Sequence, residues 1–150
     1  MDGDHTIERS FHDTSRVQHA VFTELRDQRV IPEQMLLKPN MVLSGYSAAD
    51  QASHDEVAEH TLRCLLRHVP AAVPGIVFLS GGQTDEDATA NLNAMNARGP
   101  HPWELSFSYG RALQAAPLAA WRGVEANVAG AQEAYLARAR ANGAARDGRG

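Results

Sequence analysis

The chain has 150 residues, a net charge of -4 and a pI of about 5.9, with 43% hydrophobic and 21% charged residues. This composition is ordinary for one globular domain, and an acidic balance without a basic cluster argues against a nucleic-acid partner. No apolar run approaches the roughly 20 residues of a membrane span, the N-terminus is unlike a targeting peptide, and the single cysteine, Cys64, excludes an internal disulfide and suits a cytoplasmic protein.

The first half of the chain predicts a helix, a strand and a second helix. Apolar residues recur at helical spacing over residues 6–29, and residues 35–43 form a continuous apolar run that is typical of a buried strand. Ser53 and Glu56 stand in the form of a capping box, so they predict the start of a second helix. Prolines that follow residue 69 end this helix.

The second half of the chain repeats the order of strand and helix. Residues 75–79 predict a second buried strand, and Thr84 is placed to cap the helix that follows. Residues 103–109 predict a third strand, followed by a helix over 112–121 that Pro117 kinks or splits. An alanine-rich helix completes the chain. Strands that alternate with helices predict a parallel α/β sheet, so the carboxyl ends of the strands are the place to look for chemistry.

Lys38 is the only lysine among 14 lysine and arginine residues, and it lies inside the first predicted strand. A lysine in an apolar strand is costly unless its amine reaches a polar cavity. In such a cavity a desolvated amine loses its proton more readily and becomes a nucleophile toward carbonyls. The alternative is a lysine whose amine extends from the strand end to solvent, and spacing alone favours this alternative.

The loops predicted to follow the second and third strands carry groups that suit a phosphate. Paired glycines let the backbone approach a ligand, helix-start amides bind anions, and a guanidinium can contact phosphate through two bonds. An ordinary turn and a surface arginine are the alternatives. Together the loops match the phosphate site that β/α barrels build after their last two strands, with Lys38 on the preceding strand. The loop residues concerned are Ser80, Gly81, Gly82, Ser108, Gly110 and Arg111.

The remaining candidate residues have simpler interpretations. The seven histidines contain no HExxH-type pair, so they are interpreted as surface residues and not as a metal site. Cys64 lies on the apolar side of its helix and is interpreted as a small core residue. The acidic residues 85–87 suit the start of a helix. Trp103 and Trp121 are both interpreted as core aromatic residues.

Three segments occur in an order and spacing that resemble a known family. LLKPNMV, GIVFLSGGQTDEDATANLNAMN and WELSFSYGRALQ are similar to the C-terminal part of class I fructose-1,6-bisphosphate aldolase, and the similarity covers roughly residues 2–142. The resemblance implies a partial (β/α)8 TIM barrel. Residues 1–142 would hold its last three strand-helix units, a preceding helix and a C-terminal helix, and residues 143–150 would form a flexible tail.

The family cleaves fructose 1,6-bisphosphate to dihydroxyacetone phosphate and glyceraldehyde 3-phosphate through a lysine Schiff base, without a metal or other cofactor. By resemblance, Lys38 is the Schiff-base lysine, and the two loops bind the substrate phosphates. The implied partner is a sugar phosphate, neither a nucleic acid nor a membrane. The resemblance also implies a cytoplasmic location and either a homo-oligomer, usually a tetramer in the family, or pairing with an N-terminal half. Fructose 1-phosphate remains open as the preferred substrate.

The chain also departs from the family pattern. A full barrel takes about 250 residues, and only three strands are predicted here. In the family, the preceding strands carry an aspartate, two further lysines and a glutamate for proton transfer, and the C-terminus often carries a tyrosine. We therefore expect this chain alone to lose roughly 10²–10⁴-fold in proton transfer. The alternative function is a non-catalytic, sugar-phosphate-binding or self-associating partial barrel with open sheet edges.

Overall fold

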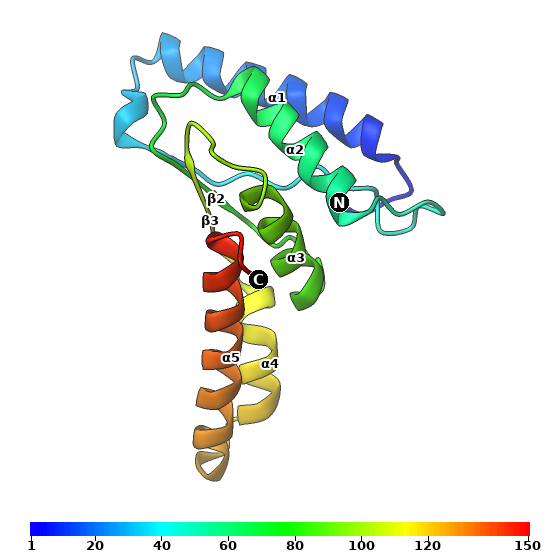
Figure 1. Cartoon of the computed structure of the whole chain (residues 1–150), viewed down its shortest axis with the longest axis vertical. Coiled ribbons are helices and arrows are strands. Elements are labelled where there is room, and N and C mark those ends of the chain that lie inside the picture. Colours follow the sequence, from blue (N-terminus) through cyan, green and yellow to red (C-terminus); the bar gives the residue numbers. More distant parts are fainter.

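The computed structural model describes residues 1–150, in which five α-helices surround and extend a three-stranded sheet (Figure 1). Two short 3-10 helices, η1 and η2, lie before the first strand and before the last helix. In chain order the elements are α1 (Ile7–Asp27), η1 (Pro32–Gln34), β1 (Leu36–Leu37), α2 (His54–His68), β2 (Gly75–Phe78), α3 (Asp85–Asn96), β3 (Glu104–Phe107), α4 (Arg111–Trp121), η2 (Glu125–Asn127) and α5 (Val128–Arg146).

The strands form one parallel sheet in the order β1-β2-β3, which confirms the predicted α/β class. Leu37 pairs with Ile76, and Ile76 pairs with Leu105, so the three strands are aligned side by side. Their carboxyl ends therefore meet at one edge of the sheet. The connections between the strands are the helices α2 and α3, as expected for crossovers between parallel strands.

The first strand is shorter than residues 35–43, and this prediction is wrong. Pro39 accepts a hydrogen bond from the Leu79 amide through its carbonyl at 3.1 Å, but a proline has no amide to donate in return. Beyond Pro39, the Val42 amide donates to the Thr61 hydroxyl of α2 at 2.9 Å and not to a neighbouring strand. The last part of the apolar run, residues 41–43, is nevertheless buried, because α1 and α2 cover it in place of a neighbouring strand.

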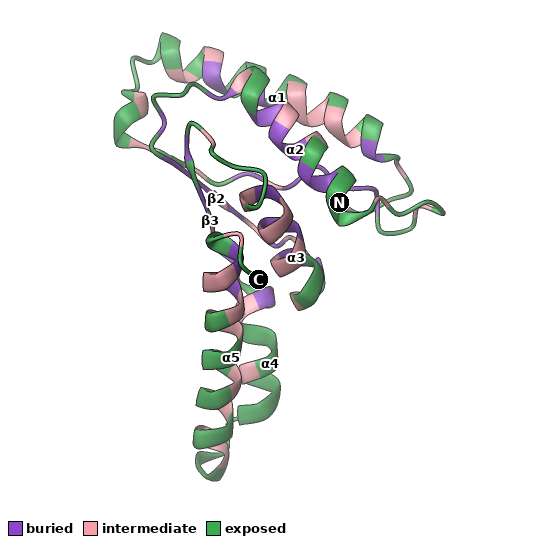
Figure 2. Cartoon of the chain, viewed as in Figure 1, coloured by how far each residue is buried: buried purple, intermediate pink, exposed green.

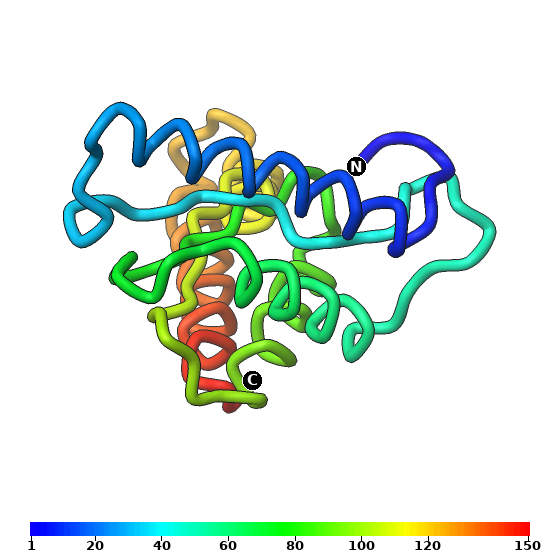
Figure 3. Tube along the Cα trace, turned by 90° about the horizontal axis from the view of Figure 1, so that it is seen from above, coloured from blue at the N-terminus to red at the C-terminus, as the bar shows by residue number.

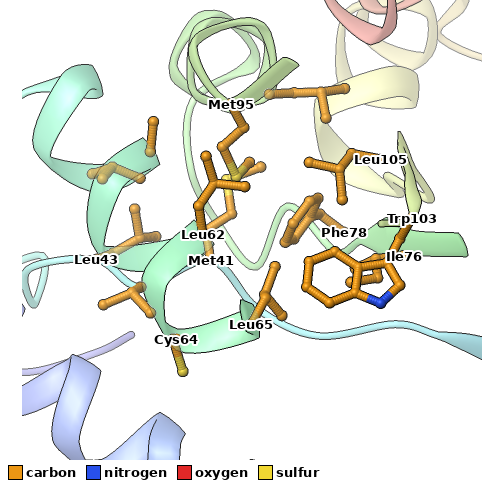
Figure 4. Close-up of a cluster of buried hydrophobic side chains, with 14 of the residues drawn as sticks. Met41, Leu43, Leu62, Cys64, Leu65, Ile76, Phe78, Met95, Trp103 and Leu105 are labelled. Carbon is orange, nitrogen blue, oxygen red and sulfur yellow. The ribbon is translucent and has the colours of Figure 1, made fainter. Parts of the chain in front are cut away.

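One face of the sheet packs against α2 and α3 and forms the core (Figure 4). Ile76 and Phe78 on β2 are fully buried, and Leu65 from α2 and Met95 from α3 point toward them. Helix α1 lies beside α2, on the outer side of the layer formed by α2 and α3, as the view from above also shows (Figure 3). The alternation of side chains along a strand fixes which residues face the core.

The opposite face of the sheet is not covered in the same way. Leu36 on β1 is 61% exposed, and the residues that share its face on the neighbouring strands, such as Val77 and Ser106, are only half-buried. On the core-facing side, by contrast, Leu105 is 2% exposed. The structure is thus a sheet with one packed face and one open face, as a segment of a barrel wall would be.

Helices α4 and α5 form an antiparallel hairpin that extends away from the sheet and is largely exposed (Figure 2). Pro117 lies inside α4 without ending it. The prediction that Trp121 is a core residue is wrong, because its side chain is 43% exposed on this hairpin.

The predicted end of the last helix at residue 142 is also wrong. The helix continues to Arg146, since Ala145 is buried and its carbonyl accepts a hydrogen bond from the Asn96 amide group at 3.1 Å. None of the helices is both long and apolar enough to cross a membrane.

Candidate active site

Lys38 directly follows β1, which ends two residues before β2 and β3 in the shared register. The register that pairs Leu37 with Ile76 places Lys38 beside Val77, on the open face of the sheet, where its side chain is exposed. The sequence left open whether the amine of Lys38 lies in a polar cavity or extends from the strand end to solvent. In this structure the side chain extends to solvent. The same position directs the amine toward the side on which a closed barrel would have its interior.

The loop after β2 is shaped by two successive glycines. Gly81 has a φ of +59° and Gly82 a φ of +99°, conformations that residues with a Cβ rarely adopt. Neither of their amides donates to an acceptor within the chain. Ser80 precedes them and is 4% exposed. Consecutive free amides in such a turn form a concave anion site.

The loop after β3 lies against the first loop. The Ser108 amide donates to the Phe78 carbonyl at 2.8 Å, which aligns the two loops at their start. Gly110 is the N-cap residue of α4 and offers no side-chain cap, so the Arg111 and Ala112 amides have no acceptor within the chain. Arg111 lies 3.4 Å, through Nη2, from the point where a Cβ on Gly82 would stand. The structure therefore brings the glycine loop and the guanidinium together, and both groups suit an anion.

Buried side chains hold the two loops from behind. The Tyr109 hydroxyl donates to the Ala88 carbonyl at 2.7 Å and fixes the second loop against α3. The Gln83 amide group donates to the Ser80 carbonyl at 3.2 Å, and the Asn91 amide group donates to the Gln83 side-chain oxygen at 2.8 Å. Gln83 and Asn91 are both buried. These contacts hold the two loops in place before any ligand binds.

A further residue of the site was missed from the sequence. Tyr46 comes from the loop after the first strand, and its hydroxyl donates to the Gly81 carbonyl at 3.1 Å. A cleft of about 240 Å³ lies behind it, with Ser44, Gly82 and Asn91 among its walls. The rule that ligands bind at the carboxyl ends of parallel strands points to this loop as a whole, but not to Tyr46 within it.

The structure places three of the other candidates, Cys64, Trp103 and Thr84, as the sequence indicated. Cys64 is 1% exposed in the core, and burial raises the pKa of its thiol, which lowers its reactivity. Trp103 is 5% exposed and donates to the Pro70 carbonyl at 2.9 Å. Thr84 caps α3 by accepting a bond from the Asp87 amide at 3.0 Å. No three His, Cys, Asp or Glu side chains are grouped so as to hold a metal ion.

Comparison with known proteins identifies the family. The family model described as "Glycolytic: Fructose-bisphosphate aldolase class-I" matches residues 1–149. The chain therefore belongs to the class I fructose-bisphosphate aldolases. Among curated relatives of this aldolase chain, fructose-bisphosphate aldolase 1 of Toxoplasma gondii is 55% identical over 148 residues, which are 99% of the chain and 41% of the relative. Cytosolic fructose-bisphosphate aldolase 4 of Arabidopsis thaliana is 54% identical over 143 residues, which are 95% of the chain and 36% of the relative.

A solved aldolase structure shows the same fold. Fructose-bisphosphate aldolase from Plasmodium falciparum, crystallised in complex with TRAP and a small-molecule inhibitor, superposes with a TM-score of 0.97 at 51% identity. The match covers 99% of this chain and 43% of that chain. This aldolase chain thus spans about two fifths of the length of its relatives. Its three strands and five helices are the corresponding part of the aldolase barrel, as the resemblance implied.

Proposed function

We propose that this chain supplies the Schiff-base lysine and both phosphate loops of an enzyme that reversibly cleaves fructose 1,6-bisphosphate to dihydroxyacetone phosphate and glyceraldehyde 3-phosphate. The observation that carries the proposal is the meeting of three loops at one sheet edge. There Lys38 follows β1, the free amides of Gly81 and Gly82 follow β2, and Arg111 follows β3. Neighbouring strands are about 4.8 Å apart, so one sugar phosphate can span all three.

The proposed chemistry follows from the groups at this edge. The Lys38 amine adds to the ketone carbon, and loss of water gives a protonated imine. This imine accepts the electron pair of the bond between the α and β carbons, as the hydroxyl on the β carbon gives its proton to a base and that carbon leaves as the aldehyde. Protonation of the resulting enamine and addition of water release the ketone phosphate and regenerate the amine. Ser80, the glycine amides, Ser108, Gly110 and Arg111 would hold the phosphate so that the ketone stays beside Lys38.

The proton transfers require groups that this chain does not supply at the site. Lys38 is the only lysine, and it forms no ion pair with a carboxylate of this chain. We infer that these groups come from the part of the barrel that the relatives carry in addition to the matched region. Full activity then requires that part, whether in one polypeptide or by association. The names of the relatives, cytosolic in Arabidopsis and cytoplasmic in Cicer arietinum, support a cytoplasmic location.

A second function is a sugar-phosphate-binding partial barrel without turnover, which associates with itself or with another chain. The open face of the sheet favours it. In the isolated chain Lys38 is exposed there. The two functions share the phosphate loops and differ in whether Lys38 reacts.

Borohydride trapping with dihydroxyacetone phosphate separates the two functions. Because there is one lysine, a reduced adduct found by peptide mapping has only the N-terminal amine as a competitor. The Schiff-base proposal expects an adduct at Lys38 that inorganic phosphate suppresses and that Lys38→Arg abolishes. If the folded chain binds phosphate but gives no adduct, the binding function holds and the chemistry requires the rest of the barrel. An adduct that phosphate does not suppress would contradict the phosphate loops.

A further inference from the structure

Tyr46, in the loop after β1, contacts the glycine loop after β2. Its hydroxyl donates to the Gly81 carbonyl at 3.1 Å and also lies 3.2 Å from the sulfur of Met1. Its ring stands 3.5 Å from the point where a Cβ on Gly82 would lie. The Arg111 guanidinium stands 3.4 Å from the same point. Tyr46 therefore lies against both glycines of the loop and shares the surroundings of Gly82 with Arg111.

The hydrogen bond to Gly81 acts on a single peptide group. The Gly81 carbonyl and the Gly82 amide belong to the same planar, trans unit, so they point in opposite directions. A donor fixed on the carbonyl holds the orientation of this unit, and it also polarises the unit so that the amide becomes a stronger donor. The Gly82 amide has no acceptor within the chain. The contact thus prepares this amide for an acceptor from outside.

The Tyr46 hydroxyl remains protonated and can therefore donate this hydrogen bond. Burial raises the pKa of the Tyr46 phenol, and this outweighs the opposite effect of the nearby Arg111 charge. Asp2 and Asp87 act in the same direction as burial. The phenol is therefore neutral around pH 7, and the hydrogen bond to the loop persists under the conditions in which a phosphate would bind.

We propose that Tyr46 is a positioning residue of the phosphate site, which sets phosphate affinity by orienting and polarising the peptide group between Gly81 and Gly82. This inference rests on the proposed function, because it assumes that the glycine loop receives a phosphate. It adds a residue from the loop after β1, so that the loops after all three strands contribute to one phosphate site. Tyr46 does not touch the phosphate in this arrangement.

The test compares two tyrosine-to-phenylalanine variants of the full 150-residue chain, with inorganic phosphate as the probe. Tyr46 is 41% exposed and Tyr135, on the α4–α5 hairpin, is 43% exposed, so Tyr135→Phe is a matched control. Loss of one such hydrogen bond should weaken phosphate binding by about 2- to 10-fold in Tyr46→Phe. Phosphate affinity should be unchanged in Tyr135→Phe. Calorimetric or NMR titration gives the dissociation constants.

A spectroscopic measurement separates positioning from mere structural support. In Tyr46→Phe the amide proton of Gly82 should resonate upfield of its wild-type position before phosphate is added, because the peptide group is less polarised. The amides of α5 should not move. A variant that is less stable but keeps the Gly82 resonance and the phosphate affinity of the wild type overturns the proposal.

An arginine variant makes failure of the site distinguishable from failure of the Tyr46 role. Arg111→Ala should weaken phosphate binding more than Tyr46→Phe does, since it removes a charge. If Arg111→Ala loses phosphate while Tyr46→Phe binds it as the wild type does, the phosphate site stands and the role of Tyr46 is overturned. If the wild type shows no phosphate-dependent shift at Gly81 and Gly82, both the site and the role of Tyr46 are overturned.

Discussion

At the scale of single residues, Tyr109 links the stability of the chain to the position of the loop after β3. Its hydroxyl is buried against the Ala88 carbonyl, and burial raises the pKa of its phenol well above the ordinary value, with Arg138 opposing the shift. A raised folded-state pKa favours the protonated form. The stabilisation is therefore complete below the unfolded-state pKa of about 10, and it is lost as pH rises above that value.

The Tyr109→Phe variant tests this link. Between pH 9.5 and pH 11, the free energy of unfolding of the wild type should fall more steeply than that of the variant, by up to about 1.4 kcal/mol per pH unit. At pH 7 the variant should be less stable by about 1 kcal/mol, because the Ala88 contact is lost. Urea unfolding at several pH values measures both effects. Tyr135→Phe is the control. Equal slopes for the wild type and Tyr109→Phe would show that Tyr109 ionises as readily in the folded chain as in the unfolded chain.

The site residues differ in how far the sequence alone reveals them. Lys38 and the loops around Gly81 and Arg111 were predicted because they follow apolar strands, and the carboxyl ends of parallel strands meet at one edge. Tyr46 was not predicted, because its partner Gly81 lies in another loop and no periodicity connects them. A contact between two loops depends on how the elements pack, and that information is not local.

At the scale of elements, the loop after β1 is held by the N-terminal segment. The Gly45 amide donates to the His5 carbonyl at 2.8 Å, the Tyr46 amide to the Met1 carbonyl at 3.1 Å, and the Ser47 amide to the Gly3 carbonyl at 2.8 Å. A Cβ on Gly45 would overlap the Gly3 carbonyl oxygen. The close pairing of these two segments therefore requires a glycine, and it also positions Tyr46 against the loop of Gly81 and Gly82.

We expect Gly45→Ala to destabilise the chain by about 1–3 kcal/mol, because backbone atoms must move apart. The variant should also bind phosphate more weakly, since the shift displaces Tyr46. Urea unfolding and phosphate titration measure the two effects. Gly130→Ala is the matched control. A Cβ there meets nothing within 4 Å, and alanine is favoured over glycine in a helix by roughly 0.5–1 kcal/mol. Unchanged stability in Gly45→Ala would contradict the close pairing.

The helix starts were predicted more accurately than the strand lengths. The capping box of Ser53 and Glu56 and the Thr84 cap are present as predicted, because a cap is a contact within four residues of sequence. The first strand was predicted too long, because an apolar run reports burial and cannot distinguish cover by a strand from cover by helices. Trp121 was misassigned for a related reason, since an apolar face shows what a helix can bury but not whether a partner is present.

At the scale of the whole molecule, the fold is a segment of a barrel with two kinds of incomplete surface. The sheet has β1 and β3 at its edges and one open face. The α4–α5 hairpin carries four large apolar side chains that are 43–56% exposed: Leu118, Trp121, Tyr135 and Leu136. These four residues line one groove between the two helices. Contiguous apolar surface of this kind is uncommon on a monomer and marks a contact surface.

We therefore expect the isolated chain to self-associate, with the hairpin groove contributing to the contact. Sedimentation velocity should give a mass above 16.2 kDa that rises with concentration. The double variant Leu118→Asp/Leu136→Asp should shift the chain toward the monomer, because it places charge in the groove while both positions are exposed enough for the helices to remain folded.

Leu66→Asp is the control, since Leu66 is equally exposed, at 57%, but stands on α2, away from the hairpin. A wild-type mass of 16.2 kDa at all concentrations would show that the open surfaces are tolerated in water. An unchanged association in the double variant would instead place the contact on the sheet edges, where β1 and β3 offer unpaired backbone groups to a second chain.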